Sequence, residues 1–121
     1  MIPGNLNKII IILFLINTSV FGNQIEKKTA HMKLLNKTTN KVSENFILVN
    51  NKINWETLVI EIISCFSNPP DELPEDYVLL DVYDQLNNKE ENIYKGWMIS
   101  STPDVTSLEH PVYDLWLEDC K

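Results

Sequence analysis

Short runs of β-forming residues, separated by turn-forming residues, constrain the fold of this chain more than any other feature of its sequence. The longest run extends from Trp55 to Cys65 and is rich in β-branched residues, which favour strands over helices. Because successive side chains of a strand alternate, Leu58, Ile60 and Ile62 fall on one face of it. The run therefore predicts a strand with one strongly apolar face.

Four more β-forming runs and one short apolar segment are also predicted to form strands. Turn-forming residues separate them, notably the segment 68–74, whose three prolines prevent ladder hydrogen bonds. The remaining strands are predicted at 32–35, 46–49, 77–83, 93–99 and 112–117. Six short strands joined by turns predict a mainly β fold, either a small antiparallel β-barrel or a β-sandwich.

One short helical segment is expected between the last two strands. Thr102 suits the N-cap of a helix and Pro103 suits its first position, so a short helix or 3₁₀ turn is predicted from there to about Glu109. No repeat or linker divides the chain, and 121 residues are enough for one domain but not for two.

The first 22 residues have the pattern of an export signal. Lys8 precedes the apolar run 9–16, which is shorter than the roughly 20 residues that a membrane-spanning helix needs. We expect cleavage after Gly22, which leaves 23–30 as a flexible leader and 31–121 as a single β-rich domain in the periplasm. No stable membrane span is then expected; the alternative is a retained single-pass anchor.

Cys65 and Cys120 are the only cysteines of the chain. An even number of cysteines in an exported chain favours a disulfide, which here would close the fold by tying the C-terminus to the middle of the chain. The alternatives are metal-ligating thiols or a redox pair. Two histidines at unhelpful spacings make a poor zinc set, and there is no Cys-x-x-Cys motif.

The charge balance argues against one large class of partners. The formal net charge is −7 at pH 7, and a chain of this sign is repelled by phosphate backbones and anionic lipid surfaces. Every basic residue is a lysine, so no guanidinium group is present to bind a phosphate or carboxylate. We therefore expect no nucleic-acid binding, and no motif indicates a cofactor.

A catalytic role can be constructed around His110 and Asp114, with Ser100 or Ser101 as the nucleophile. A histidine beside an aspartate can act as a general base with its orienting partner. However, the sequence contains neither a nucleophile-elbow motif nor a Gly-rich oxyanion loop. A histidine before a proline more often binds the backbone of a turn.

Acidic residues suggest two further chemistries without supplying the matching pattern. Glycosidases need two carboxylates that face each other across a cleft, and a calcium loop needs oxygen ligands at fixed spacing. The acidic loop Asp71, Glu72, Glu75 and Asp76 lacks such spacing, so no metal site is predicted. The carboxylates considered as possible pairs are Asp81, Asp84, Asp114, Glu118 and Asp119, for which a solvated acidic face is the simpler interpretation.

Residues 94–119 concentrate aromatic, hydroxyl and acidic side chains and include a candidate binding face. A tryptophan usually belongs to a core, but exposed rings can form a stacking platform for a sugar or a partner chain. Tyr94 and Trp97 would face opposite sides of a strand, which limits any single platform. The candidate face consists of Trp97, Met98, Ser101, Thr102, His110, Tyr113, Asp114 and Trp116.

Several of these residues also resemble a known family. The blocks are Gly96-Trp97-Met98, Ser101-Thr102-Pro103, Leu108-Glu109-His110-Pro111-Val112-Tyr113-Asp114, Trp116 and Cys120, with Cys65, Pro69, Pro70 and Pro74 upstream. Over residues 31–120 the chain resembles domain of unknown function 2155, a group of small exported proteins of alphaproteobacteria. It departs from the pattern at Thr102, where serine is expected, and at Asn68, where arginine is expected. The resemblance implies export and a disulfide but no particular activity.

These observations predict a non-enzymatic interaction or accessory domain of the cell envelope. Its partner would be another envelope protein or a cell-wall component. The alternative is an envelope hydrolase that uses His110, Asp114 and a serine, for which a pocket at His110 would be required.

Overall fold

The computed structural model describes residues 23–108 and 110–121. The predicted export signal at 1–22 and Glu109, at the end of the predicted helical segment, lie outside the described residues. In the described part of the chain, no helix has the length and apolar character needed to cross a membrane.

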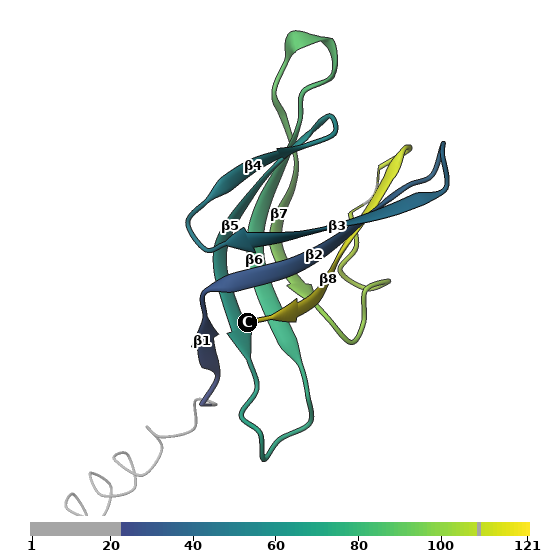
Figure 1. Ribbon diagram of the computed structural model, residues 1–121. Helices are drawn as coiled ribbons and strands as arrows, with labels where there is room; N and C mark the ends of the chain where they lie inside the picture. Colours follow the sequence, from purple (N-terminus) through teal and green to yellow (C-terminus); the bar gives the residue numbers. More distant parts are fainter. Residues whose placement is uncertain (1–22, 109) are drawn as a thin grey trace, which may run out of the picture.

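In the described residues, eight strands form two antiparallel sheets (Figure 1). In chain order they are β1 (Ile25–Lys27), β2 (Thr29–Asn36), β3 (Lys41–Leu48), β4 (Lys52–Trp55), β5 (Leu58–Ser67), β6 (Asp76–Asp84), β7 (Glu91–Ile99) and β8 (Tyr113–Cys120). The first sheet has the order β1-β5-β6-β7, with β4 also paired to β5, and the second has the order β3-β2-β8. The prediction of a mainly β fold is confirmed.

Alternate residues of the strands fill one core to which both sheets contribute. In β6, Val78, Leu80 and Val82 are fully buried, because every second side chain of a strand points to the same face. The residues that β2, β5 and β8 add to the same cluster include Ala30, Met32, Leu34, Leu58, Ile60, Ile62, Leu115 and Leu117. The side chains at positions 77, 79, 81 and 83 of β6 therefore face away from the core.

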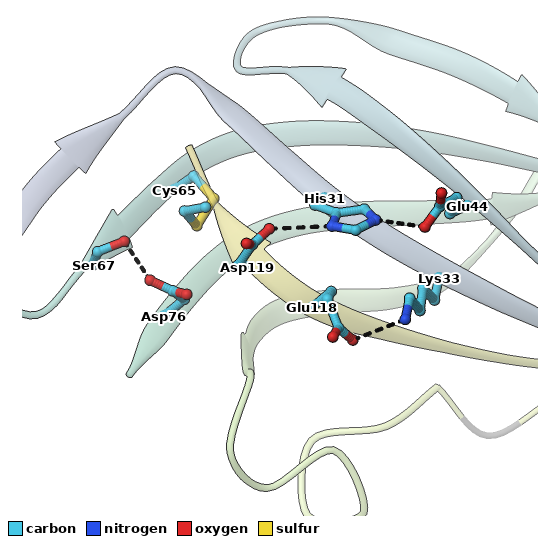
Figure 2. Close-up of polar contacts among 9 residues, drawn as sticks. His31, Lys33, Glu44, Cys65, Ser67, Asp76, Glu118 and Asp119 are labelled. Atoms are coloured by element: carbon cyan, nitrogen blue, oxygen red, sulfur yellow. Dashed lines mark hydrogen bonds and ion pairs between the residues drawn. A yellow bond between two sulfur atoms is a disulfide. The ribbon is translucent and has the colours of Figure 1, made fainter. Parts of the chain in front are cut away.

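The predicted disulfide between Cys65 and Cys120 is confirmed, and it joins the two sheets. Cys65 lies in β5 of the first sheet and Cys120 lies in β8 of the second, with their Cα atoms 5.9 Å apart. Both residues are buried, and Figure 2 shows the bridge beside the end of β8. Because the bridge connects positions 55 residues apart, it holds the C-terminus against the core.

The N-terminal segment 23–30 differs from the expected flexible leader. Residues 25–27 form β1, which pairs with the end of β5, and Thr29 already begins β2. Sequence periodicity could not reveal β1, because its side chains are largely exposed and its pairing rests on main-chain hydrogen bonds. Lys28 marks the bend at which the chain passes from the first sheet to the second.

Two local predictions also differ from the structure. Trp55 ends β4 instead of beginning the long strand, because Glu56 adopts a positive φ of 56° in the tight turn that precedes Leu58. The segment predicted as a short helix or 3₁₀ turn from Thr102 forms only a single turn, in which the Val105 N–H donates to the Thr102 carbonyl three residues before it, and no helix follows at 106–108. A 3₁₀ turn occurs instead at Leu86–Asn88, where asparagines adopt the positive φ that they tolerate.

Candidate functional site

The outer face of the first sheet is unusually apolar at the end that lies near the disulfide. Strand pairing places Phe66 opposite Tyr77, Tyr77 opposite Ile99, and Leu79 opposite Trp97. We call these five residues the aromatic patch. Trp97 is 46% exposed, and its ring centroid lies 6.1 Å from that of Phe66. None of the five belongs to the core cluster, so together they form an apolar surface on the side of the sheet away from the core.

Next to the aromatic patch, a row of four charged residues crosses the same face. Strand pairing places Lys52 opposite Glu61, Glu61 opposite Asp81, and Asp81 opposite Lys95. We call these four residues the charged row. Within the described residues, none of the four takes part in an ion pair with a nitrogen-to-oxygen distance of 4.0 Å or less. Two carboxylates therefore lie side by side in the middle of the row, with a lysine at each end.

Asp81 occupies an uncommon position for a carboxylate on the outer face of a sheet. Its neighbours cover it so that only 8% of the residue is exposed. Its Oδ1 atom is buried and has no hydrogen-bond partner among the described residues. A buried carboxylate oxygen without a donor is costly, and most such atoms in proteins are hydrogen-bonded. Asp81 is therefore a carboxylate of this face whose Oδ1 atom receives no hydrogen bond from the described residues.

His110 lies buried beside a carboxylate, but the carboxylate belongs to Asp84 and not to Asp114. Nε2 of His110 lies 2.7 Å from Oδ2 of Asp84, at the end of β6. Nδ1 accepts hydrogen bonds from the backbone N–H groups of Val112 (3.0 Å) and Tyr113 (3.3 Å). Since Nδ1 accepts, Nε2 carries the proton that Asp84 binds. Both ring nitrogens therefore hold the chain in place before β8.

The residues of the hydrolase alternative are not brought together. Asp114 faces outward from the second sheet and forms an ion pair with Lys37 at 3.4 Å. Ser100 and Ser101 bind Glu75 next to the start of β6, whereas the partner of His110 lies at the other end of that strand (Figure 1). Eight residues of strand separate the two ends, or about 26 Å at about 3.3 Å per residue. A serine and His110 thus lie at opposite ends of the first sheet.

Glu75 joins the loop before β6 to the loop after β7. Its Oε1 atom accepts hydrogen bonds from the Ser100 hydroxyl (3.0 Å) and the Ser101 N–H (2.9 Å), and its Oε2 atom accepts one from the Ser101 hydroxyl. Burial alone would raise the pKa of Glu75, but these hydrogen bonds favour the charged form and lower the pKa overall.

In the described part of the chain, no group of three acidic, histidine or cysteine side chains could hold a metal ion.

On the outer face of the second sheet, His31 contacts carboxylates from both neighbouring strands (Figure 2). Its Nδ1 lies 3.2 Å from Oδ1 of Asp119 in β8, and its Nε2 lies 2.9 Å from Oε2 of Glu44 in β3. The imidazole also stacks on Phe46, with ring centroids 4.2 Å apart. Lys33 pairs with Glu118 beside it. These contacts link the three strands, and the sequence pattern did not single out His31.

The eight residues of the predicted binding face do not form one surface. Met98, His110 and Tyr113 are buried, whereas Trp97 is exposed on the outer face of the first sheet. The others are Asp114 and Trp116 on the outer face of the second sheet, and Ser101 and Thr102 in the loop after β7. Only Trp97 belongs to the aromatic patch.

The sequence did not single out the other residues on the outer face of the first sheet. Phe66 lies just beyond the predicted run that ends at Cys65, Tyr77 has no role beyond its predicted strand, and Asp81 is one of several carboxylates that could form a pair. One signal was available: β6 is apolar at 77 and 79 as well as at 78 and 80, so both of its faces carry apolar side chains. That pattern indicates a strand covered on both sides.

Fold and site together define a small two-sheet β-protein, closed by a disulfide, with an aromatic and charged outer face. The chain belongs to the family described as uncharacterized protein conserved in bacteria, DUF2155, whose model matches residues 30–120. The family resemblance of the sequence is thereby confirmed.

The chain is also similar to the uncharacterized protein RP359 of Rickettsia prowazekii (strain Madrid E). The two are 24% identical over 87 residues, which represent 71% of this chain. The matched region spans 56% of the length of that relative, so the chain corresponds to little more than half of it. No solved structure matches the chain significantly.

Proposed function

We propose that this chain is a non-enzymatic interaction domain of the bacterial cell envelope, exported through its N-terminal segment. The aromatic patch is the observation that carries the proposal. An antiparallel sheet with one solvated face normally shows polar residues on that face. Here Trp97 is exposed and the other four residues of the patch are partly buried beside charged residues, an arrangement typical of surfaces that bind another molecule.

Two features support a location outside the cytoplasm. The disulfide between Cys65 and Cys120 is a bond that persists in oxidising compartments such as the periplasm. The apolar run 9–16 after Lys8 has the length of a signal-peptide core. Cell fractionation and an intact mass measured on the periplasmic fraction test this part, with a mass that begins at about Asn23 as the expected result.

The partner is another envelope protein or a cell-wall component that covers the aromatic patch. A hydrolase receives no support from the geometry, because both nitrogens of His110 are engaged and the serines lie at the other end of the sheet. A binding surface requires only that its rings remain exposed, as Trp97 does.

In-cell photo-crosslinking tests the proposal. The crosslinking amino acid p-benzoylphenylalanine replaces Tyr77 within the aromatic patch, which keeps the phenyl ring and replaces the hydroxyl with a benzoyl group. We expect one recurrent partner, whose capture falls sharply in Trp97→Ala. Phe46→Ala is the matched control, since Phe46 is an exposed ring on the second sheet. Recovery of the protein without any partner, from cells in which it is stably produced, would contradict the proposed function.

A further inference from the structure

We infer that the aromatic patch and the charged row together bind a basic segment of a protein partner, through a lysine or arginine that reaches Asp81 and Glu61. This inference rests on the proposed function and deepens it by assigning the chemistry of the partner. Three features of this face support it: the unpartnered Oδ1 atom of Asp81, the two adjacent carboxylates of the charged row, and the aromatic rings beside them.

The two central carboxylates need a cation. Like charges that lie directly opposite each other on neighbouring strands are destabilising, and Glu61 and Asp81 are such a pair. Among the described residues, neither lysine of the row forms an ion pair with them, and the Nζ of Lys52 lies 5.8 Å from the centre of the Tyr83 ring. A cation from outside would relieve the repulsion between the two carboxylates, and it would donate to the covered Oδ1 atom of Asp81 once the side chains over that atom move aside.

The neighbouring rings suit a long basic side chain. Trp97 lies opposite Leu79, which is two residues before Asp81 on the same outer face. The aliphatic stem of a lysine or arginine can pack on such a surface while its charged end reaches the carboxylates. An aromatic face also attracts the cation itself, most strongly when the ring is tryptophan. The patch and the row thus offer the two halves of a single binding site.

A face-to-face dimer centred on the charged row is disfavoured by charge. In a face-to-face dimer, every two-fold axis that passes through the middle of the row places like charges against each other: carboxylates meet carboxylates and lysines meet lysines. A neutral sugar could stack on the rings but would leave the two carboxylates without a counter-charge. The net charge of −7 also favours a basic partner, through attraction at long range.

Variants of the crosslinking protein test the inference. Asp81→Asn and Glu61→Gln each remove one charge from the row, and Glu118→Gln removes one from the outer face of the second sheet as a matched control. We expect the capture of the partner by the crosslinker at position 77 to fall about tenfold in the first two variants and to stay unchanged in the control. Asp81→Asn should fold normally, since it removes a buried unpaired carboxylate, and urea unfolding verifies this.

Charge reversal completes the test. Asp81→Lys should abolish capture, and replacing the partner's lysine or arginine nearest the crosslink by aspartate should restore it. Equal capture by wild type, Asp81→Asn and Glu61→Gln would overturn this inference while leaving the proposed function intact. A crosslink to a second copy of the chain or to a glycan would likewise overturn it. Failure to capture any partner would overturn both.

Discussion

Removal of the disulfide between Cys65 and Cys120 is the perturbation whose magnitude follows most directly from the structure. The bridge closes a loop between positions 55 residues apart. The chain-entropy relation for a loop of this length gives a stabilisation of about 4 kcal/mol at 25 °C. Domains of this size are stable by about 5–15 kcal/mol in total, so the bridge accounts for a large share. At about 4–8 °C per kcal/mol, its loss should lower the Tm by about 20 °C or more.

Urea unfolding of four proteins measures this effect: the oxidised wild type, Cys65→Ala, Cys120→Ala and the double variant. Fluorescence of Trp55, which is buried and donates to the Ser43 hydroxyl, reports the transition. Each single variant should lose about as much free energy of unfolding as the double variant, because either substitution opens the same loop. The m value should rise, since an unfolded chain without the cross-link exposes more surface.

Two results would refute this reasoning. A loss below about 1 kcal/mol in the double variant would mean that the bridge does not restrict the unfolded chain as the loop length requires. Losses in the single variants that add up to that of the double variant would mean that each cysteine stabilises by its own packing. Free-thiol titration of the denatured, non-reduced wild type is the control and should detect no thiol.

Two further predictions concern polar side chains. His110→Ala should lower the free energy of unfolding by at least about 2 kcal/mol, because it leaves the buried Asp84 carboxylate without the imidazole that it binds. A urea unfolding curve close to that of wild type would contradict a structural role for the contact between His110 and Asp84. Glu75→Gln should destabilise the protein at pH 7. The pKa of Glu75 in the folded state lies below its ordinary value of 4.5. Its contribution to the free energy of unfolding is therefore fully present above pH 4.5 and is lost as the pH falls through the lowered pKa. The stability difference from wild type should therefore narrow between pH 7 and pH 3, and a constant difference would argue against these hydrogen bonds.

Local patterns in the sequence were sufficient for the mainly β class and for the disulfide. β-branched runs and turn residues act over a few neighbouring positions, so strands at 77–83 and 93–99 could be located within two residues of β6 and β7. With only two cysteines in the chain, the pairing of Cys65 with Cys120 left no alternative partner. Short-range chemistry of this kind is readable without knowing what packs against each strand.

The sequence did not predict features that depend on backbone pairing alone. β1 has mostly exposed side chains, and it exists because its main chain completes the edge of β5. The predicted helix at Thr102 was favoured by its first two residues only, and the loop there is held instead by contacts with other parts of the chain. One of these is the hydrogen bond from the Ile99 N–H to the Thr106 hydroxyl.

The sequence by itself determined most of the segments that become strands, which cysteines pair and which side chains of each predicted strand alternate. Only the tertiary structure decided which strands are neighbours, and that decision created the candidate site. Asp81 lies 20 positions after Glu61 and 14 before Lys95, and the three meet because their strands align in register. The apolar pattern of each strand and the turns between strands limit the register, but which strands become neighbours depends on the packing of the whole core. The aromatic patch lies beside the two carboxylates for the same reason.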